Sequence, residues 1–154
     1  MVPVGVGSLA EAVVIHSKSS NPPRTVLAVE PHDGACHWAS LQTGKMTTIK
    51  TKYNIMPGMT CGTLSMTAWP VLKAGIDACV TVSDAKVHQA VLDLESLDIL
   101  AGPCGGASLA ALRHVVNSDP EAIRLTPDSV VVLISSEGPR EYSPSMREVD
   151  IVRD

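Results

Sequence analysis

The chain has 154 residues and a formal net charge of −4 at pH 7, and 45% of its residues are hydrophobic. This length and composition predict one globular domain, residues 1–154, with a core of its own. The 12 Lys and Arg residues are scattered along the chain, which argues against a nucleic-acid partner. The apolar stretches are too short to span a bilayer and no signal peptide is apparent, so we expect a cytoplasmic protein without a membrane partner.

The predicted elements alternate between strand and helix along the chain. Strand-like runs occupy Val2–Val4, Thr25–Val29, Ala78–Val82 and Val130–Ile134, and helix-like segments lie near 8–18, 34–43, 65–74, 84–97 and 105–117. Such alternation is typical of parallel sheets covered by helices. We therefore predict an α/β fold with three layers, αβα, around a mainly parallel sheet.

Apolar patterns predict how two of these elements are buried. Val130–Ile134 is apolar at every position, which predicts a central strand covered on both faces. In the segment after Ser83, a residue suited to cap a helix, apolar residues recur at helical spacing. They are Val87, Ala90, Val91, Leu94 and Leu97. This pattern predicts a helix that packs on the sheet.

The cysteines show no arrangement typical of a metal site. Cys36, Cys61, Cys79 and Cys104 form no C-x-x-C pair, and their spacing to the five histidines does not suit a metal. Free cysteine is among the residues most often buried. We therefore expect reduced, mostly buried thiols, and neither a metal nor a disulfide framework.

A glycine-rich turn stands between the first strand and the first helix. Gly5 and Gly7 can take positive φ and let the backbone approach a ligand, and Ser8 opens a helix whose first N–H groups can bind an anion. The turn therefore predicts a phosphate site. The alternative is a tight turn that serves packing alone.

The same turn also fits a dinucleotide-binding fingerprint. Gly5-x-Gly7-x-x-Ala10 is followed by Glu30 at the end of the next strand, where an acidic residue would bind a ribose hydroxyl. A Rossmann domain is therefore one hypothesis.

Two later turns and one long loop add candidates. Residues 101–112 enter a helix through small side chains, which permit close approach of a ligand or simply tight packing. Ser135 begins a polar turn after the apolar strand, at the edge where ligands bind in α/β sheets, although a serine there can also cap the strand. Residues 45–64 form a loop too long for a mere connector, and such loops often face a ligand.

Together these segments resemble the fold type II pyridoxal-phosphate enzymes of the tryptophan synthase beta-like group, most closely the 2,3-diaminopropionate ammonia-lyase family. Residues 4–10 resemble its phosphate loop, and residues 29–31 its Val-Glu-Pro strand end. Residues 54–62, followed by Trp69, resemble its Ile-Met-Ala-Gly-Leu-x-Cys-Gly loop and the helix after it. Residues 133–138 resemble its Ile-Ser-Thr-Glu-Gly turn.

The resemblance implies pyridoxal 5'-phosphate as cofactor and a set of binding residues. The phosphate would be held by backbone N–H groups and by the Ser8 hydroxyl, and Ser135 would face the pyridine nitrogen. The implied phosphate-binding residues are Gly5, Val6, Gly7, Ser8 and Leu9. The implied reaction is α,β-elimination of ammonia from a diamino acid to give a keto acid. Departures at Pro57, Cys104 and Ser136 leave the exact substrate open.

The resemblance also implies that a catalytic part is missing. In the family, the Schiff-base lysine precedes the phosphate loop, and none of the six lysines here stands in such a motif. We therefore assign no catalytic residue and expect a partial large domain, inactive alone, that forms a homodimer or is complemented by an N-terminal half. A non-catalytic cofactor- or phosphate-binding module and a dinucleotide-binding domain are the alternatives.

Overall fold

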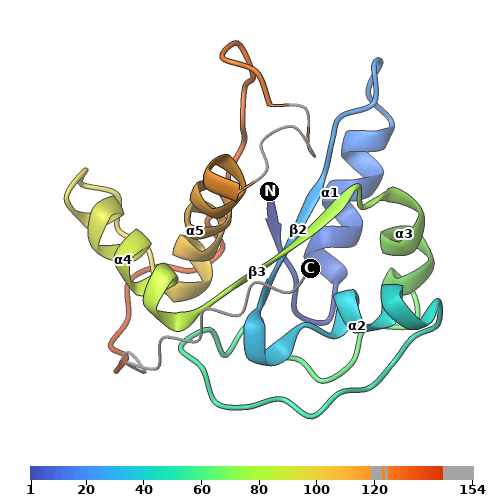
Figure 1. Ribbon diagram of the computed structural model, residues 1–154, viewed down its shortest axis with the longest axis horizontal. Coiled ribbons are helices and arrows are strands. Elements are labelled where there is room, and N and C mark those ends of the chain that lie inside the picture. Colours follow the sequence, from blue (N-terminus) through green and yellow to red (C-terminus); the bar gives the residue numbers. More distant parts are fainter. Residues whose placement is uncertain (119–122, 124, 144–154) are drawn as a thin grey trace.

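The computed structural model describes residues 1–118, 123 and 125–143 (Figure 1). In this part of the chain, parallel strands β1 (Val2–Pro3), β2 (Leu27–Pro31) and β3 (Ala78–Val82) pair in the order β1-β2-β3. The helices are α1 (Ser8–Lys18), the 3-10 turn η1 (His32–Gly34), α2 (Cys36–Thr43), α3 (Ala68–Gly75), α4 (Asp84–Glu95) and α5 (Pro103–Ser118). Helices α4 and α5 cover one side of the sheet, and α1 and α3 the other (Figure 1). The predicted three-layer α/β fold is confirmed.

Alternating side chains of β2 build two separate cores. Leu27 and Val29 belong to the core shared with α4 and α5, whereas Ala28 belongs to the core shared with α1 and α3. Successive residues of a strand point to opposite faces, so a fully apolar strand buries both faces. All five residues of β2 are buried.

Local signals set several element boundaries. Helix α1 and strand β3 have the predicted bounds. Gly44 ends α2 with φ +71°, and the Ser83 hydroxyl caps α4 by accepting the Lys86 N–H at 3.4 Å. Helix α4 ends at Glu95, two residues before the predicted end, and Leu97 is 68% exposed. Leu97 is therefore not part of the buried face that the pattern predicted.

The prediction of a buried central strand at Val130–Ile134 is wrong. The segment contains no regular strand, and Val130 and Val132 are 92% and 68% exposed. Its backbone is hydrogen-bonded to Met1, whose N-terminal amine donates to the Val132 carbonyl at 2.8 Å and whose carbonyl accepts the Ile134 N–H at 3.3 Å, and Ile134 packs against the core on the α1 and α3 side of the sheet. Burial on both faces needs neighbours that the described part of the chain does not place beside this segment.

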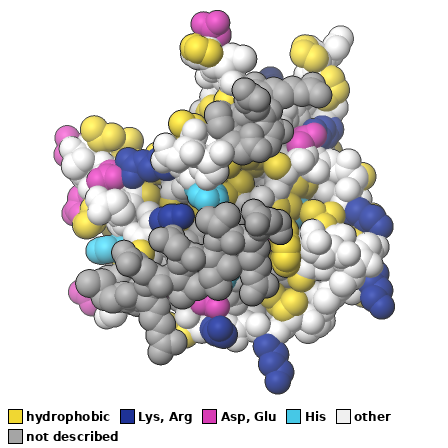
Figure 2. All heavy atoms as spheres, in the orientation of Figure 1, with side chains coloured by type: hydrophobic (Ala, Val, Ile, Leu, Met, Phe, Trp, Pro, Cys, Tyr) yellow, Lys and Arg dark blue, Asp and Glu magenta, His cyan; other side chains and the backbone are white. Residues whose placement is uncertain are grey.

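Basic side chains do not cluster on the visible face, and the cysteines form no disulfide among the described residues. Lys and Arg side chains are dispersed over the face shown in Figure 2 and form no continuous patch there. All four cysteines are free, with Cys36 and Cys104 buried and Cys61 and Cys79 half-buried. Within the described ranges, no helix has the length and apolar character needed to cross a membrane.

Candidate cofactor-binding site

The turn between β1 and α1 has the geometry of an anion cradle. Gly7 is the N-cap of α1 with φ +102°, a conformation that side chains rarely adopt. A Cβ on Gly7 would lie 3.0 Å from both Ala68 Cβ and Leu72 Cδ1, so the turn is also pressed against α3. Glycine is therefore required here by conformation and by packing.

The start of α1 leaves N–H groups available for a ligand. The helix ladder begins with the Glu11 N–H donating to the Gly7 carbonyl at 2.8 Å. The N–H groups of Ser8, Leu9 and Ala10 precede that bond and have no intrahelical acceptor. The side chains of Ser8 and Leu9 are exposed, so the mouth of the turn is open to solvent. This arrangement can bind phosphate through backbone N–H groups and the helix dipole.

The 54–62 loop packs directly behind the cradle. A Cβ on Gly5 would lie 2.6 Å from the carbonyl oxygen of Gly58, and a Cβ on Gly58 would lie 3.3 Å from Cys104 Sγ. Asn54 orders the loop from within, because its Oδ1 accepts the Met56 N–H at 2.9 Å and the Thr60 hydroxyl at 2.8 Å. The long loop is thus a support of the cradle.

Ser135 lies at the same edge of the sheet as the cradle. The two hydrogen bonds of Met1 are those of a parallel bridge, so the segment ending at Ile134 runs in the direction of β1 and leaves the sheet at the same end. A Cβ on Gly105 would lie 2.5 Å from Ser135 Oγ. Ser135 is exposed, and its hydroxyl makes no hydrogen bond to the residues that the structure describes. The small residue at 105 therefore makes room for the Ser135 turn.

Glu30 does not occupy a ligand site. Its side chain is 0% exposed, and its two carboxylate oxygens accept the N–H groups of His37 at 2.8 Å and Trp38 at 2.9 Å. Burial raises the pKa of Glu30 to about 7. The dinucleotide hypothesis assigned this carboxylate to a ribose hydroxyl, and that assignment is wrong because Glu30 caps α2 inside the protein.

His37 is a buried polar residue that the sequence pattern did not single out. Its Nδ1 lies 3.3 Å from Cys79 Sγ, and burial lowers its pKa to about 4. Its Nε2 has no hydrogen-bond partner in the described part of the chain. The sequence at the start of α2, Cys36 to Trp38, contains no pattern that predicts a buried histidine side chain at position 37.

Glu137 and Arg140 are the other residues that sequence reasoning missed. Glu137 Oε2 accepts the Cys104 N–H at the start of α5 at 2.8 Å, and its Oε1 accepts from Arg140 Nε at 2.9 Å. Arg140 also donates to the carbonyl oxygen of Ile55. Only the Ser-x-Glu-Gly pattern hinted that position 137 mattered.

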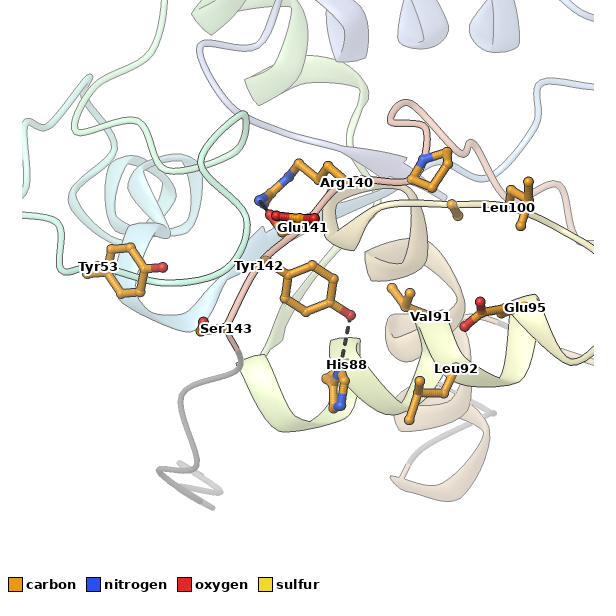
Figure 3. Close-up of a pocket in the computed structure, with 12 residues that line it drawn as sticks. Tyr53, His88, Val91, Leu92, Glu95, Leu100, Arg140, Glu141, Tyr142 and Ser143 are labelled. Atoms are coloured by element: carbon orange, nitrogen blue, oxygen red, sulfur yellow. Dashed lines mark hydrogen bonds between the residues drawn. The ribbon is translucent and has the colours of Figure 1, made fainter.

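A hollow of about 800 Å³ lies apart from the cradle (Figure 3). It is lined by α4 residues such as His88 and by the 139–143 segment, and contains none of the cradle residues. Within it, the Tyr142 hydroxyl and His88 Nδ1 are hydrogen-bonded at 2.9 Å. No group of three or more His, Cys, Asp or Glu among the described residues is placed to hold a metal.

Comparison with known proteins shows what this arrangement is similar to. The family described as "Pyridoxal-phosphate dependent enzyme" matches residues 1–137. The chain is 31% identical over 116 residues to L-threonine dehydratase biosynthetic IlvA of Pasteurella multocida, covering 75% of this chain and 23% of that protein.

Solved structures show the same similarity. The threonine deaminase of T.th. superposes with a TM-score of 0.77 at 28% identity, covering 93% of this chain and 49% of that one. Diaminopropionate ammonia lyase of Escherichia coli superposes with a TM-score of 0.76 at 25% identity, covering 89% and 38%. This chain thus spans half or less of the length of these relatives.

Proposed function

Since the chain belongs to the pyridoxal-phosphate dependent enzymes, we propose that it forms the cofactor-binding portion of a fold type II enzyme that acts on an amino acid. The observation that supports this proposal most directly is the cradle, in which Gly7, with φ +102°, is the N-cap of α1. The residues present fit a phosphate, because the first N–H groups of α1 lack intrahelical partners and the side chains of Ser8 and Leu9 beside them are exposed.

Each residue of the proposed site has one role. The backbone N–H groups of the turn and the Ser8 hydroxyl hold the cofactor phosphate. Ser135, whose hydroxyl makes no bond to the described residues, offers a neutral hydrogen bond to the pyridine nitrogen. The cofactor, when bound, supplies an electron sink for chemistry at the amino-acid α-carbon. The phosphate-binding set is Gly5, Val6, Gly7, Ser8 and Leu9.

For the substrate we propose a diamino acid, from which ammonia is eliminated to give a keto acid. The proposal is supported by the resemblance of the 54–62 loop and the Ser135 turn to the diaminopropionate ammonia-lyases, and by the superposition on one of them. The threonine dehydratase and serine racemase relatives favour amino-acid substrates in general. The departures at Pro57, Cys104 and Ser136 are where this substrate choice would be tested first.

The placement of the lysines supports a chain that binds the cofactor but does not by itself catalyse the reaction. Five of the six are exposed, and Lys18 pairs with Asp77 at 2.6 Å at the end of α1 opposite the cradle. We propose that a segment equivalent to the family's N-terminal half supplies the Schiff-base lysine, because a homodimer of this chain would add only the same six lysines. The alternative is a non-catalytic cofactor-binding module. Borohydride reduction of a chain–cofactor mixture followed by mass spectrometry tests this, and stoichiometric labelling of one lysine would contradict both proposals.

The proposed phosphate site is tested by introducing a negative charge at one end of α1 or at the other. Ser8→Asp places a carboxylate where the phosphate would sit, so calorimetric titration should show pyridoxal-phosphate affinity at least tenfold weaker, about 1.4 kcal/mol. Thermal stability should not fall, because an acidic residue suits a helix N-terminus. Ser19→Asp makes the same charge change at the opposite end of α1 and should bind as the wild type does. Equal affinity in all three proteins would overturn the cradle assignment.

A further inference from the structure

Arg140 joins segments that are distant in sequence. Its Nε donates to Glu137 Oε1 at 2.9 Å, and a terminal nitrogen donates to the carbonyl oxygen of Ile55. Its guanidinium stacks against Tyr142, with the ring centroid 5.6 Å away. Figure 3 shows the Arg140 side chain reaching from its own segment toward the loop that carries Tyr53.

Glu137 ties the turn that contains Ser135 to the start of α5. Its carboxylate accepts the Cys104 N–H at 2.8 Å, and its backbone carbonyl accepts the Gly102 N–H at 3.0 Å. An anion at a helix N-terminus is stabilised by the unpaired N–H groups there. The Arg140 and Glu137 side chains are only 31% and 21% exposed, so solvent screens their pairing less than it screens a surface ion pair.

The contact of Arg140 with Ile55 reaches the cradle through one further step. Ile55 is 1% exposed and stands in the 54–62 loop, whose Gly58 carbonyl lies against Gly5. Arg140 therefore connects the turn beside the proposed pyridine site to the loop behind the proposed phosphate site. A guanidinium presents five N–H donors in one plane, so that it can donate to a carboxylate and a carbonyl at once.

We propose that Arg140 and Glu137 are positioning residues that hold the 54–62 loop and the Ser135 turn in register with each other. Their role in positioning a cofactor site rests on the proposed function, whereas their coupling of the two segments does not depend on a cofactor. Neither residue has to touch the ligand. Losing the Arg140 guanidinium would loosen the support behind Gly5 and the orientation of Ser135 together.

Hydrogen exchange of the full chain tests the coupling without any ligand. Arg140→Met keeps an aliphatic stem and removes the guanidinium, and Arg113→Met likewise removes the ion pair between Arg113 and Asp93. We expect amides of residues 54–62 to exchange at least tenfold faster in Arg140→Met than in the wild type, with no change there in Arg113→Met. Amides of α1 should be unchanged in both variants.

A conservative variant separates positioning from general stability. Arg140→Lys keeps the charge beside Glu137 but lacks the planar fork. Compared with Arg140→Met, it should therefore slow hydrogen exchange at the Cys104 amide more than at the amides of the 54–62 loop. Unchanged exchange in the loop of Arg140→Met, or an equal change in Arg113→Met, would overturn the proposal.

A double-mutant cycle tests the link to the cofactor. Ser135→Ala should weaken pyridoxal-phosphate binding several-fold in the wild-type background but less than twofold in Arg140→Met, because the turn is already loosened. Additive effects would refute the coupling to Ser135. If the wild-type chain binds no pyridoxal phosphate, the proposed function fails, and the exchange result alone decides whether Arg140 and Glu137 hold the two segments.

Discussion

The carboxylate of Glu30 accepts the backbone N–H of His37 at 2.8 Å, at a place where both residues are 0% exposed. The two side chains respond to the same burial in opposite ways. Burial disfavours the charged form of each, so the pKa of Glu30 rises to about 7 while that of His37 falls to about 4. Both groups beside the start of α2 are therefore mainly neutral between about pH 4 and pH 7.

These opposite shifts predict a compensated pH dependence of stability. The Glu30 pKa is raised from 4.5, so its contribution is complete below pH 4.5 and is lost as pH rises toward 7. The His37 pKa is lowered from 6.5, so its contribution is complete above pH 6.5 and is lost as pH falls toward 4. Between these limits the two slopes, each about 1.4 kcal/mol per pH unit, oppose each other.

Removing Glu30 should expose the His37 slope. In Glu30→Gln, the free energy of unfolding should rise by about 3 kcal/mol between pH 4 and 6.5, relative to the wild-type profile. Urea denaturation at several pH values measures this. His37→Gln is the matched control and should show the opposite slope relative to the wild type. Profiles that run parallel to the wild type in both variants would contradict the assignment.

Gly7 and Gly44 offer a matched comparison of backbone strain. Both have positive φ, but a Cβ at Gly7 would meet Ala68 and Leu72 at 3.0 Å, whereas nothing lies within 4 Å of one at Gly44. Gly7→Ala should therefore cost about 2 kcal/mol or more of stability, and Gly44→Ala about 1 kcal/mol. Chemical denaturation measures both. A smaller loss at Gly7 than at Gly44 would argue against the tight turn.

The sequence predicts features that depend on local residues better than features that depend on which segments are neighbours in the fold. The glycine turn before Ser8 and the strand-like run at Ala78–Val82 predicted the bounds of α1 and β3, because those signals are local. The exposure of Val130–Ile134 depends on which segments lie beside it, and composition does not encode that. The glycine turn was predicted from its residue types. The buried cap made by Glu30 was not, since the same acidic residue suits a ribose or a helix N-terminus equally well.

Ser135 and Ser136 distinguish recognition of the cofactor ring from recognition of its phosphate. Ser135→Ala should weaken pyridoxal-phosphate binding by about 0.5–1.5 kcal/mol, because a hydrogen bond to the ring nitrogen is lost. Binding of inorganic phosphate should not change, since the cradle is intact. Ser136→Ala serves as the neighbouring control and should bind both as the wild type does. Equal weakening of both ligands by Ser135→Ala would place this serine in a general structural role.

Val132 and Leu97 have equal exposure, 68%, but lie in different surroundings. Val132 belongs to the extended segment whose backbone is hydrogen-bonded to Met1, together with Val130 at 92% exposure. Apolar side chains on an incompletely paired sheet edge favour association with another chain. We therefore expect the isolated protein to self-associate at micromolar concentration, and Val132→Lys to shift it toward monomer by sedimentation velocity. Leu97→Lys makes the same substitution away from that edge and should leave association unchanged. A compact, cooperatively unfolding wild-type monomer at that concentration would contradict the expectation, because the exposed edge would then be tolerated without a partner.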